Sequence, residues 1–261
     1  MKRLWVLSAS MITKKSPKDI EKLARAGALL ATILDGLVKR AIVGATGKDL
    51  DAYALHEMEL AGAKPAFLGY GQPPFPGSIC VSVNAEVVHG LPRDIPFITG
   101  DIVGIDAGLW LDGVVVDSAR TVGIGTISKE NEHLMSVTKR ALEIGIQQAQ
   151  VGNTTGDIGH AIQEYVESEE LEVVRALVGH GVGYDLHEEP QVPNFGKAGS
   201  GTRLVEGIVI AIEPMVTFVS PEIMTASDGW SIVALSGKPS AHEEHTIAIT
   251  KNGPRILTVA A

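Results

Sequence analysis

The chain has 261 residues, of which 45% are hydrophobic and 20% are charged, and its formal net charge is −9. This composition is that of a globular protein with a sizeable apolar core, and it excludes a largely disordered chain. The acidic balance argues against a dedicated nucleic-acid-binding protein, which needs a basic face for phosphate. The single cysteine, Cys80, excludes an internal disulfide and a multi-cysteine zinc module, so the cytoplasm is the simplest compartment.

The chain begins with MKRLWVLSAS, two basic residues among the first three, then a short apolar run and small residues. This order faintly resembles a secretory signal peptide, but serines interrupt the apolar run and make it too short. We interpret residues 1–10 as a flexible extension, with Met11 as an alternative first residue, and residues 11–261 as one domain. No segment approaches the ~20 consecutive apolar residues of a membrane-spanning helix.

Two helices are predicted near the start of this domain. The segment SPKD at 16–19 combines an N-cap serine, a first-turn proline and a capping acid, which predicts a helix through about residue 39. The segment TGKD at 46–49 repeats the capping pattern and predicts a second helix through about residue 60.

The texture then changes to glycine, proline and β-branched residues, which predicts strands within 75–92 and 100–125. In the second segment Asp112-Gly113 lies between two apolar runs and predicts a two-residue hairpin turn. Further helices are expected at about 128–150 and 155–169, and further strands at 207–219, 230–235 and 244–250.

Two segments of the chain are similar to each other. VGATGKDL at 43–50 and VGNTTGDI at 151–158 align without a gap, and in both a helical stretch precedes and a capped helix follows. We interpret them as parts of a duplicated half, with a site in the crevice between the two halves. Helices and strands come in blocks rather than in regular alternation, which favours an α+β fold over a doubly wound parallel sheet.

The predicted hairpin brings two aspartates together. With Asp112-Gly113 at the turn, Asp117 lies opposite Gly108, and Asp106 is two residues from Gly108 on the same face. Both aspartates lie among apolar residues, where a lone carboxylate is costly to bury. Two solvated strand aspartates are the alternative, which the apolar flanks disfavour.

Three further side chains extend this pair. Glu213 ends the run IVIAIE, whose continuous apolar character predicts a strand buried on both faces, and Glu244 enters another apolar strand. The glycine-rich segment GHGVGYDLHEEP at 179–190, which we expect to be an irregular loop, adds a histidine. Four carboxylates and one imidazole suit two hard-to-borderline divalent cations, whose charges balance those of the acids.

These motifs resemble those of the type I methionine aminopeptidases of the bacterial kind, over nearly the whole chain from about Met11. The resemblance rests on SICVSVNAEVVHGLP, GDIVGIDAGLWLDGVVVDSARTVGIG, GHGVGYDLHEEPQVPNFG, IAIEPMV and AHEEHTIAIT. It implies the pita-bread fold, an α+β fold of two pseudo-symmetric halves around a central dinuclear metal site, and it makes residues 11–261 one catalytic domain.

The resemblance also implies roles for individual residues. Glu213 would act as general base and then acid, His187 would stabilise the oxyanion, and His89 would hydrogen-bond the substrate. Asp117 and Glu244 would bridge two metal ions. The implied metal ligands are Asp106, Asp117, His180, Glu213 and Glu244, and the implied methionine pocket is lined by Cys80, Phe75, Tyr70 and Trp230. Pocket residues of these types are alternatively plain core. His242 and His245 flank Glu244, and His245 is expected to support it at most.

The activity implied is removal of the initiator methionine from nascent proteins when the second residue is small, by attack of a metal-bridging water. The implied cofactors are two divalent ions (Co, Mn, Fe or Zn). The implied state is a cytoplasmic monomer that associates transiently with the ribosome and binds no membrane and no nucleic acid.

Three alternatives remain open. A prolidase or proline-specific aminopeptidase shares the fold, but usually carries an extra N-terminal domain. A non-catalytic binding module on the same scaffold would have lost metal ligands, and none is lost here. A metal site that only stabilises the fold would not explain His89 and His187. The short stretch between His187 and Ile212 leaves no room for the helical insertion of the type II branch.

Overall fold

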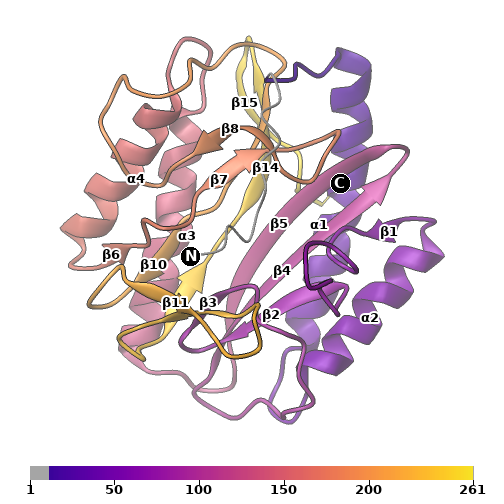
Figure 1. Cartoon of the computed structure of the whole chain (residues 1–261), viewed down its shortest axis with the longest axis vertical. Coiled ribbons are helices and arrows are strands. Elements are labelled where there is room, and N and C mark those ends of the chain that lie inside the picture. Colours follow the sequence, from indigo (N-terminus) through magenta and orange to yellow (C-terminus); the bar gives the residue numbers. More distant parts are fainter. Residues whose placement is uncertain (1–11, 261) are drawn as a thin grey trace.

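The computed structural model describes residues 12–260, so the prediction for residues 1–10 lies outside the described part. Figure 1 shows helices on two opposite sides of the molecule, with strands between them. The helices are α1 (Pro17–Arg40), α2 (Gly47–Leu60), α3 (Lys129–Gln148) and α4 (Thr155–Ser168). Each agrees with its predicted range to within two residues. Within the described part, none of them combines the length and apolar character needed to cross a membrane.

The first sheet is built around a long hairpin, as predicted. Its strands are β1 (Lys64–Pro65), β2 (Ile79–Val83), β4 (Ile102–Leu111) and β5 (Val114–Gly123). β4 and β5 pair along their whole length, with Gly108 opposite Asp117. At the turn, Asp112 and Gly113 have φ of 52° and 78°, the two left-handed residues that a type I′ turn requires.

Helix α1 packs its apolar stripe against this hairpin. Ser16 caps the helix by accepting a hydrogen bond from the backbone N–H of Asp19. Leu23, Leu30 and Leu34 recur at helical spacing and are fully buried in the core that also contains the inward residues of β4 and β5. The first helix therefore fixes the hairpin from behind.

The second sheet has five strands in the order β15-β14-β9-β7-β8. They are β7 (Gly179–Gly181), β8 (Glu188–Val192), β9 (Val209–Ile212), β14 (His245–Thr250) and β15 (Gly253–Ile256). All residues of the central strand β9 are buried, as its continuous apolar run predicted. Ile162 of α4 and Leu134 of α3 share a core with Ile210 and Ile247 of the sheet.

Two smaller sheets connect the halves, in the orders β13-β10-β6 and β11-β12-β3. Their strands are β3 (Glu86–Val88), β6 (Glu172–Val173), β10 (Met215–Thr217), β11 (Ile223–Thr225), β12 (Ile232–Ala234) and β13 (Ser240–His242). Because β12 pairs with β3, a strand of the C-terminal half completes a sheet with a strand of the N-terminal half.

The duplication predicted from the repeated octapeptides is visible in the structure. Thr46 and Thr154 each cap a helix in a capping box with an aspartate three residues later. Each threonine also forms an isolated antiparallel bridge, Thr46 with Pro96 and Thr154 with Arg203. The two helix pairs thus begin from equivalent local structures.

Two predictions of secondary structure were wrong. The run 207–219 is not one strand, because it breaks before Pro214, which has no N–H for a ladder, and its two parts join different sheets. The segment 179–190 is not an irregular loop, since β7 and the start of β8 lie in it. A Cβ at Gly181 would lie only 2.3 Å from the backbone oxygen of Glu189, so glycine permits this close pairing.

Candidate metal centre and active site

The hairpin presents two aspartates to a pocket between the halves. Asp106 on β4 and Asp117 on β5 are diagonal neighbours, because Asp117 pairs with Gly108. A Cβ at Gly108 would lie 3.3 Å from Oδ1 of Asp117 and 3.0 Å from the ring of Phe67, so glycine leaves the space that the carboxylates occupy. The diagonal pair predicted from the hairpin register is therefore present.

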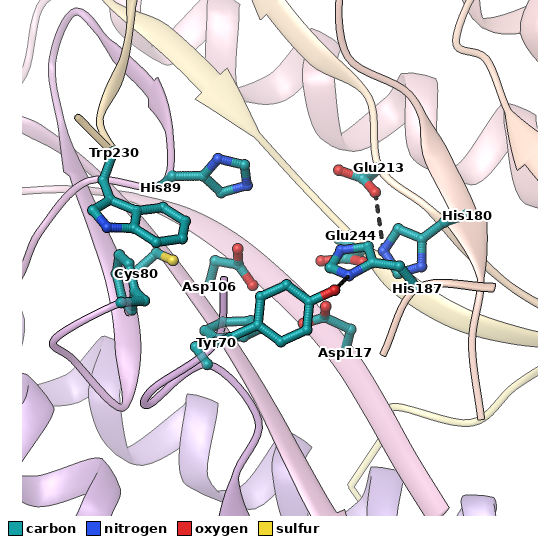
Figure 2. A pocket seen from close by; sticks show the side chains of 12 residues that line it. Tyr70, Cys80, His89, Asp106, Asp117, His180, His187, Glu213, Trp230 and Glu244 are labelled. Carbon is teal, nitrogen blue, oxygen red and sulfur yellow. Dashed lines mark hydrogen bonds and ion pairs between the residues drawn. The ribbon is translucent and has the colours of Figure 1, made fainter. Parts of the chain in front are cut away.

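The five-stranded sheet supplies the other three polar side chains from adjacent strands. His180 lies on β7, Glu213 directly follows β9, and Glu244 directly precedes β14. The expectation that all four carboxylates lie on strands and the histidine on a loop is therefore corrected. β9 lies between β7 and β14, so the ends of three neighbouring strands bring these residues to the hairpin (Figure 2).

The hydrogen bond of His180 fixes which ring nitrogen faces the acids. Nδ1 lies 2.8 Å from the carbonyl oxygen of Gly181, so Nδ1 carries the hydrogen and donates it. Nε2, which then carries the lone pair, is 3.5 Å from Oε1 of Glu213. Burial lowers the pKa of His180 to about 4, so the ring is neutral and Nε2 is available as a ligand atom near neutral pH.

Burial also determines the charge of the four carboxyl groups. It raises the pKa of Asp106 to about 7, and it raises the pKa of Asp117, Glu213 and Glu244 well above their ordinary values, with repulsion between the acids as the second cause. Within residues 12–260, no lysine or arginine forms an ion pair with any of the four. The cluster therefore needs protons or metal cations to remain buried.

Metal cations fit this cluster. Asp117, His180 and Glu244 each offer a ligand atom, and the three atoms lie within 4.8 Å of one another. Among the described residues, Oδ1 of Asp106 and Oε1 of Glu244 are buried without a hydrogen-bond partner. Such oxygens, together with a neutral imidazole, are the donor set expected for divalent ions of hard to borderline character.

The other end of the same pocket is apolar. Phe75 and Trp230 are buried and meet edge to face, with ring centroids 5.2 Å apart. Cys80 is paired with Asp106 across β2 and β4 and is buried. Burial, followed by the nearby acids, raises the pKa of the Cys80 thiol well above its ordinary value, so it is a neutral lining group and not a nucleophile.

Two further histidines, His89 and His187, line the same pocket. The His187 ring lies 4.3 Å from the His180 ring, centroid to centroid, and its Nδ1 is hydrogen-bonded to the Tyr70 hydroxyl at 2.9 Å (Figure 2). His89 has a φ of 58°, a left-handed conformation that is uncommon for histidine and is often found at functional sites. Burial lowers the pKa of His89 to about 4 and that of His187 well below 6.5, so both rings are neutral.

Comparison with known proteins places the chain in a family. A model of metallopeptidase family M24 matches residues 21–251. The methionine aminopeptidase of Clostridium perfringens is 45% identical over 250 residues, which are 95% of this chain and 99% of that protein. The chain belongs to the methionine aminopeptidases of metallopeptidase family M24. The crystal structure of methionine aminopeptidase from Thermotoga maritima matches this M24 chain with a TM-score of 0.93 at 42% identity, covering 95% of this chain and 100% of that one.

The M24 fold extends beyond this group. The prolidase of Pyrococcus horikoshii matches with a TM-score of 0.76 at 24% identity, and the chain covers 65% of it. That likeness shows the fold alone. The pita-bread fold predicted from the sequence is confirmed, and so is the prediction of a metal-dependent peptidase.

The structure brings every residue predicted for the site into one pocket. Those residues are Tyr70, Phe75, Cys80, His89, Asp106, Asp117, His180, His187, Glu213, Trp230 and Glu244. Phe67 also lines the pocket and was left out of the predicted site. It precedes Tyr70 in a loop, where the spacing of residues in the sequence does not indicate which way a side chain points.

The two histidines that flank Glu244 differ in what they contact. Nε2 of His242 is buried and lies 3.7 Å from Oε2 of Glu213, so this residue reaches the site. Nδ1 of His245 is instead hydrogen-bonded to the hydroxyl of Thr258 at 2.8 Å. Only His242 therefore stands beside the acids.

Proposed function

We propose that this M24 enzyme hydrolyses the N-terminal methionine from peptides and nascent proteins. The observation that carries the proposal is the juxtaposition of a buried cluster of ligand-type side chains with a pocket of sulfur and aromatic groups. Such a pocket suits the flexible thioether of methionine. The high identity to methionine aminopeptidases over nearly the whole chain supports the same activity.

Two divalent ions, Co, Mn, Fe or Zn, are the proposed cofactors. The side chains that would hold them are Asp106, Asp117, His180, Glu213 and Glu244. When bound, the ions supply positive charge that polarises a carbonyl group and acidifies a water molecule. Four ionised carboxylates balance the charge of two such ions, which supports this stoichiometry.

Glu213 is the proposed group for proton transfer. Its carboxylate takes the proton of the attacking water and passes it to the leaving amine, acting first as base and then as acid. Both of its neighbours, His180 at 3.5 Å and His242 at 3.7 Å, are neutral rings, because burial lowers their pKa to about 4 and about 3. Among residues 12–260, no lysine or arginine forms an ion pair with Glu213 that would hold it ionised.

His187 and His89 are the proposed groups that contact substrate. As neutral imidazoles they can donate one hydrogen bond and accept another, whereas a cationic ring would repel the metal ions. We assign His187 to the oxyanion that develops on the scissile carbonyl, and His89 to the substrate near the scissile amide. Both histidines line the pocket that also holds the ligand-type side chains, which supports this assignment.

Substrate selection follows from the two ends of the pocket. Cys80, Phe75, Tyr70 and Trp230 are the proposed wall around the methionine side chain. The second residue of the substrate would lie near the metal ligands, so we propose that only a small side chain is accepted there.

We further propose that residues 11–261 act as one catalytic unit, because both halves contribute to the site. The proposed substrate is a nascent chain, so we propose a cytoplasmic location and transient ribosome association. The family resemblance suggests a monomer. We propose that the protein has no dedicated nucleic-acid-binding surface, and its net charge of −9 supports this.

One experiment separates this function from its rivals. Metal content and hydrolysis of Met-Ala-Ser and of Ala-Pro are measured on the same purified sample. We expect two bound divalent ions and cleavage of Met-Ala-Ser alone. Cleavage of Ala-Pro alone would replace the proposal with a prolidase, and a metal-free, inactive sample would replace it with a binding module.

A further inference from the structure

A buried ion pair outside the pocket holds the loop that carries His187. It joins Lys15, which directly precedes the cap of α1, to Glu188, the first residue of β8. The side chains of Lys15 and Glu188 are only 1% and 4% exposed. A buried ion pair is weak evidence for stability, so its position in the fold matters more than its presence.

The Glu188 carboxylate links two segments that are far apart in the sequence. Its Oε1 accepts hydrogen bonds from the backbone N–H groups of Tyr184 and Asp185, at 2.6 and 3.0 Å. Its Oε2 accepts from the ammonium group of Lys15 and the hydroxyl of Thr13. One carboxylate therefore closes the turn before His187 and ties that turn to the N-terminal segment.

Several further contacts hold Lys15 in this place. Its backbone N–H donates to the carbonyl oxygen of Gly207 at 2.7 Å. Its side chain passes over Gly183, where a Cβ would lie 2.5 Å from Cε of Lys15. Tyr184 adds a second tie, because its hydroxyl donates to Asp19 on α1 at 2.9 Å.

The charges of the pair depend on each other. Burial lowers the pKa of Lys15, and the hydrogen bond to Glu188 is the largest influence that opposes this. Burial would raise the pKa of Glu188, but the bonds from Lys15 and Thr13 outweigh it, and the pKa lies below its ordinary value. Removing either partner leaves a buried charge without compensation.

The pair lies directly next to catalytic groups. Glu188 follows His187 in the chain and pairs across strands with Gly181, the neighbour of His180. On its far side the His187 ring is held by the Tyr70 hydroxyl. The backbone anchor at Glu188 and the side-chain contact at Tyr70 thus constrain His187 from two directions.

We propose that the Lys15–Glu188 pair, with Thr13, is a positioning device that sets the place of His187 in the active site. The inference rests on the proposed catalytic role of His187. A shift of about 1 Å in a catalytic group can reduce a rate a hundredfold, so a loosened anchor would be seen in turnover without any change at the metal ligands.

A double-mutant cycle tests this. Lys15→Met, His187→Ala and the double variant are assayed for kcat/KM on Met-Ala-Ser, with metal content measured in each. We expect Lys15→Met to lower kcat/KM about tenfold in the parent enzyme but less than about twofold in the His187→Ala background, with metal content unchanged. A residue that only anchors the fold would lower kcat/KM by the same factor in both backgrounds, and that outcome overturns the inference.

Two further variants complete the test. Lys14→Met makes the same chemical change at the exposed neighbouring residue and should leave kcat/KM unchanged. If Lys15→Met does not fold, Thr13→Val takes its place in the cycle with the same expected pattern, because it removes the hydroxyl that donates to Glu188 and accepts from Lys15 but keeps the ion pair. An inactive parent enzyme would refute the proposed function. An active parent in which the effects of the two substitutions on kcat/KM simply multiply would refute only the positioning role.

Discussion

At the scale of single residues, burial sets the protonation of the site. The pKa of Asp106 is raised to about 7 and those of His89 and His180 are lowered to about 4, in each case because the charged form loses its hydration. Near neutral pH the imidazoles are therefore ready to act as neutral ligands and donors. The carboxylates need cations to remain ionised, so metal binding should release protons.

The first prediction concerns Glu213. Glu213→Gln keeps the shape of the side chain but cannot take a proton, so kcat on Met-Ala-Ser should fall at least about a hundredfold. The control is Glu206→Gln, which removes an exposed carboxylate of the same type in an ion pair with Lys251. A Glu213→Gln enzyme that keeps more than about a tenth of the parent rate would rule out general-base catalysis by this residue.

The second prediction concerns the contact between Tyr70 and His187. Tyr70→Phe removes the hydroxyl and leaves the ring in the pocket wall, so kcat/KM should fall about three- to tenfold, the range expected for one hydrogen bond. Tyr165→Phe is the matched control, because Tyr165 belongs to the other core. Equal rates for Tyr70→Phe and the parent would show that the hydroxyl does not orient His187.

At the scale of elements, the β4–β5 hairpin decides where the aspartates stand. The left-handed turn at Asp112 and Gly113 fixes the register, and the register places Gly108 between the two carboxylates. The site therefore requires glycine at position 108 as well as the two carboxylates, because a larger residue would occupy their space.

The third prediction compares two glycines on the same face of β4. Gly108→Ala places a Cβ 3.0 Å from Phe67 and 3.3 Å from Asp117, so it should weaken metal binding and lower kcat about tenfold or more. Gly104→Ala meets nothing closer than 3.7 Å and should leave both unchanged. Titration of the metal-free variants with Mn²⁺ and a turnover assay check this, and equal behaviour of the two variants would contradict it.

The fourth prediction uses the duplicated helix caps. Thr46→Ala and Thr154→Ala each remove a capping box, and each should lower the free energy of unfolding by about 1 kcal/mol. Urea denaturation measures both. A difference between them of more than about 1 kcal/mol would show that the two halves do not use the repeated motif in equivalent ways.

At the scale of the whole molecule, the site belongs to neither half alone. Asp106 and Asp117 come from the hairpin of the N-terminal half, whereas His180, Glu213 and Glu244 come from the five-stranded sheet of the other. Cations held between them would link the halves. Metal removal should therefore affect the stability of the whole fold as well as activity.

The fifth prediction follows the pH dependence of the metal-free protein. The pKa of Asp106 is about 7 in the folded state against an ordinary value of 3.8, so between these values the folded state binds the extra proton and its stability falls as pH rises. Metal-free Asp106→Asn lacks this loss. The free energy of unfolding of this variant, relative to that of the parent, should therefore increase by on the order of 4 kcal/mol between pH 4 and pH 7, since one pKa unit corresponds to about 1.36 kcal/mol.

Denaturant unfolding in excess chelator at the two pH values measures this gain. With Mn²⁺ in place of chelator, the parent should instead be more stable than Asp106→Asn, because the metal stabilises the parent more than the variant. A stability difference between variant and parent that does not change with pH would contradict the raised pKa.

The sequence by itself determined the local structure and the chemistry of this protein. Helix caps such as Ser16 and Thr46 and the turn at Asp112-Gly113 follow from interactions within a few residues. The diagonal placement of Asp106 and Asp117 follows from the hairpin register that this turn sets. The resemblance of five motifs to one family gave the proposed ligand set, because four of those motifs carry its ligand-type residues in order along the chain.

Only the tertiary structure decided which distant segments meet. It divided the run 207–219 between two sheets, paired β12 with β3, and brought Tyr70 to His187 and Lys15 to Glu188. These contacts join residues more than a hundred positions apart or strands of different halves. Local propensity and periodicity carry no information about such pairs, because their geometry depends on how the two cores pack against each other.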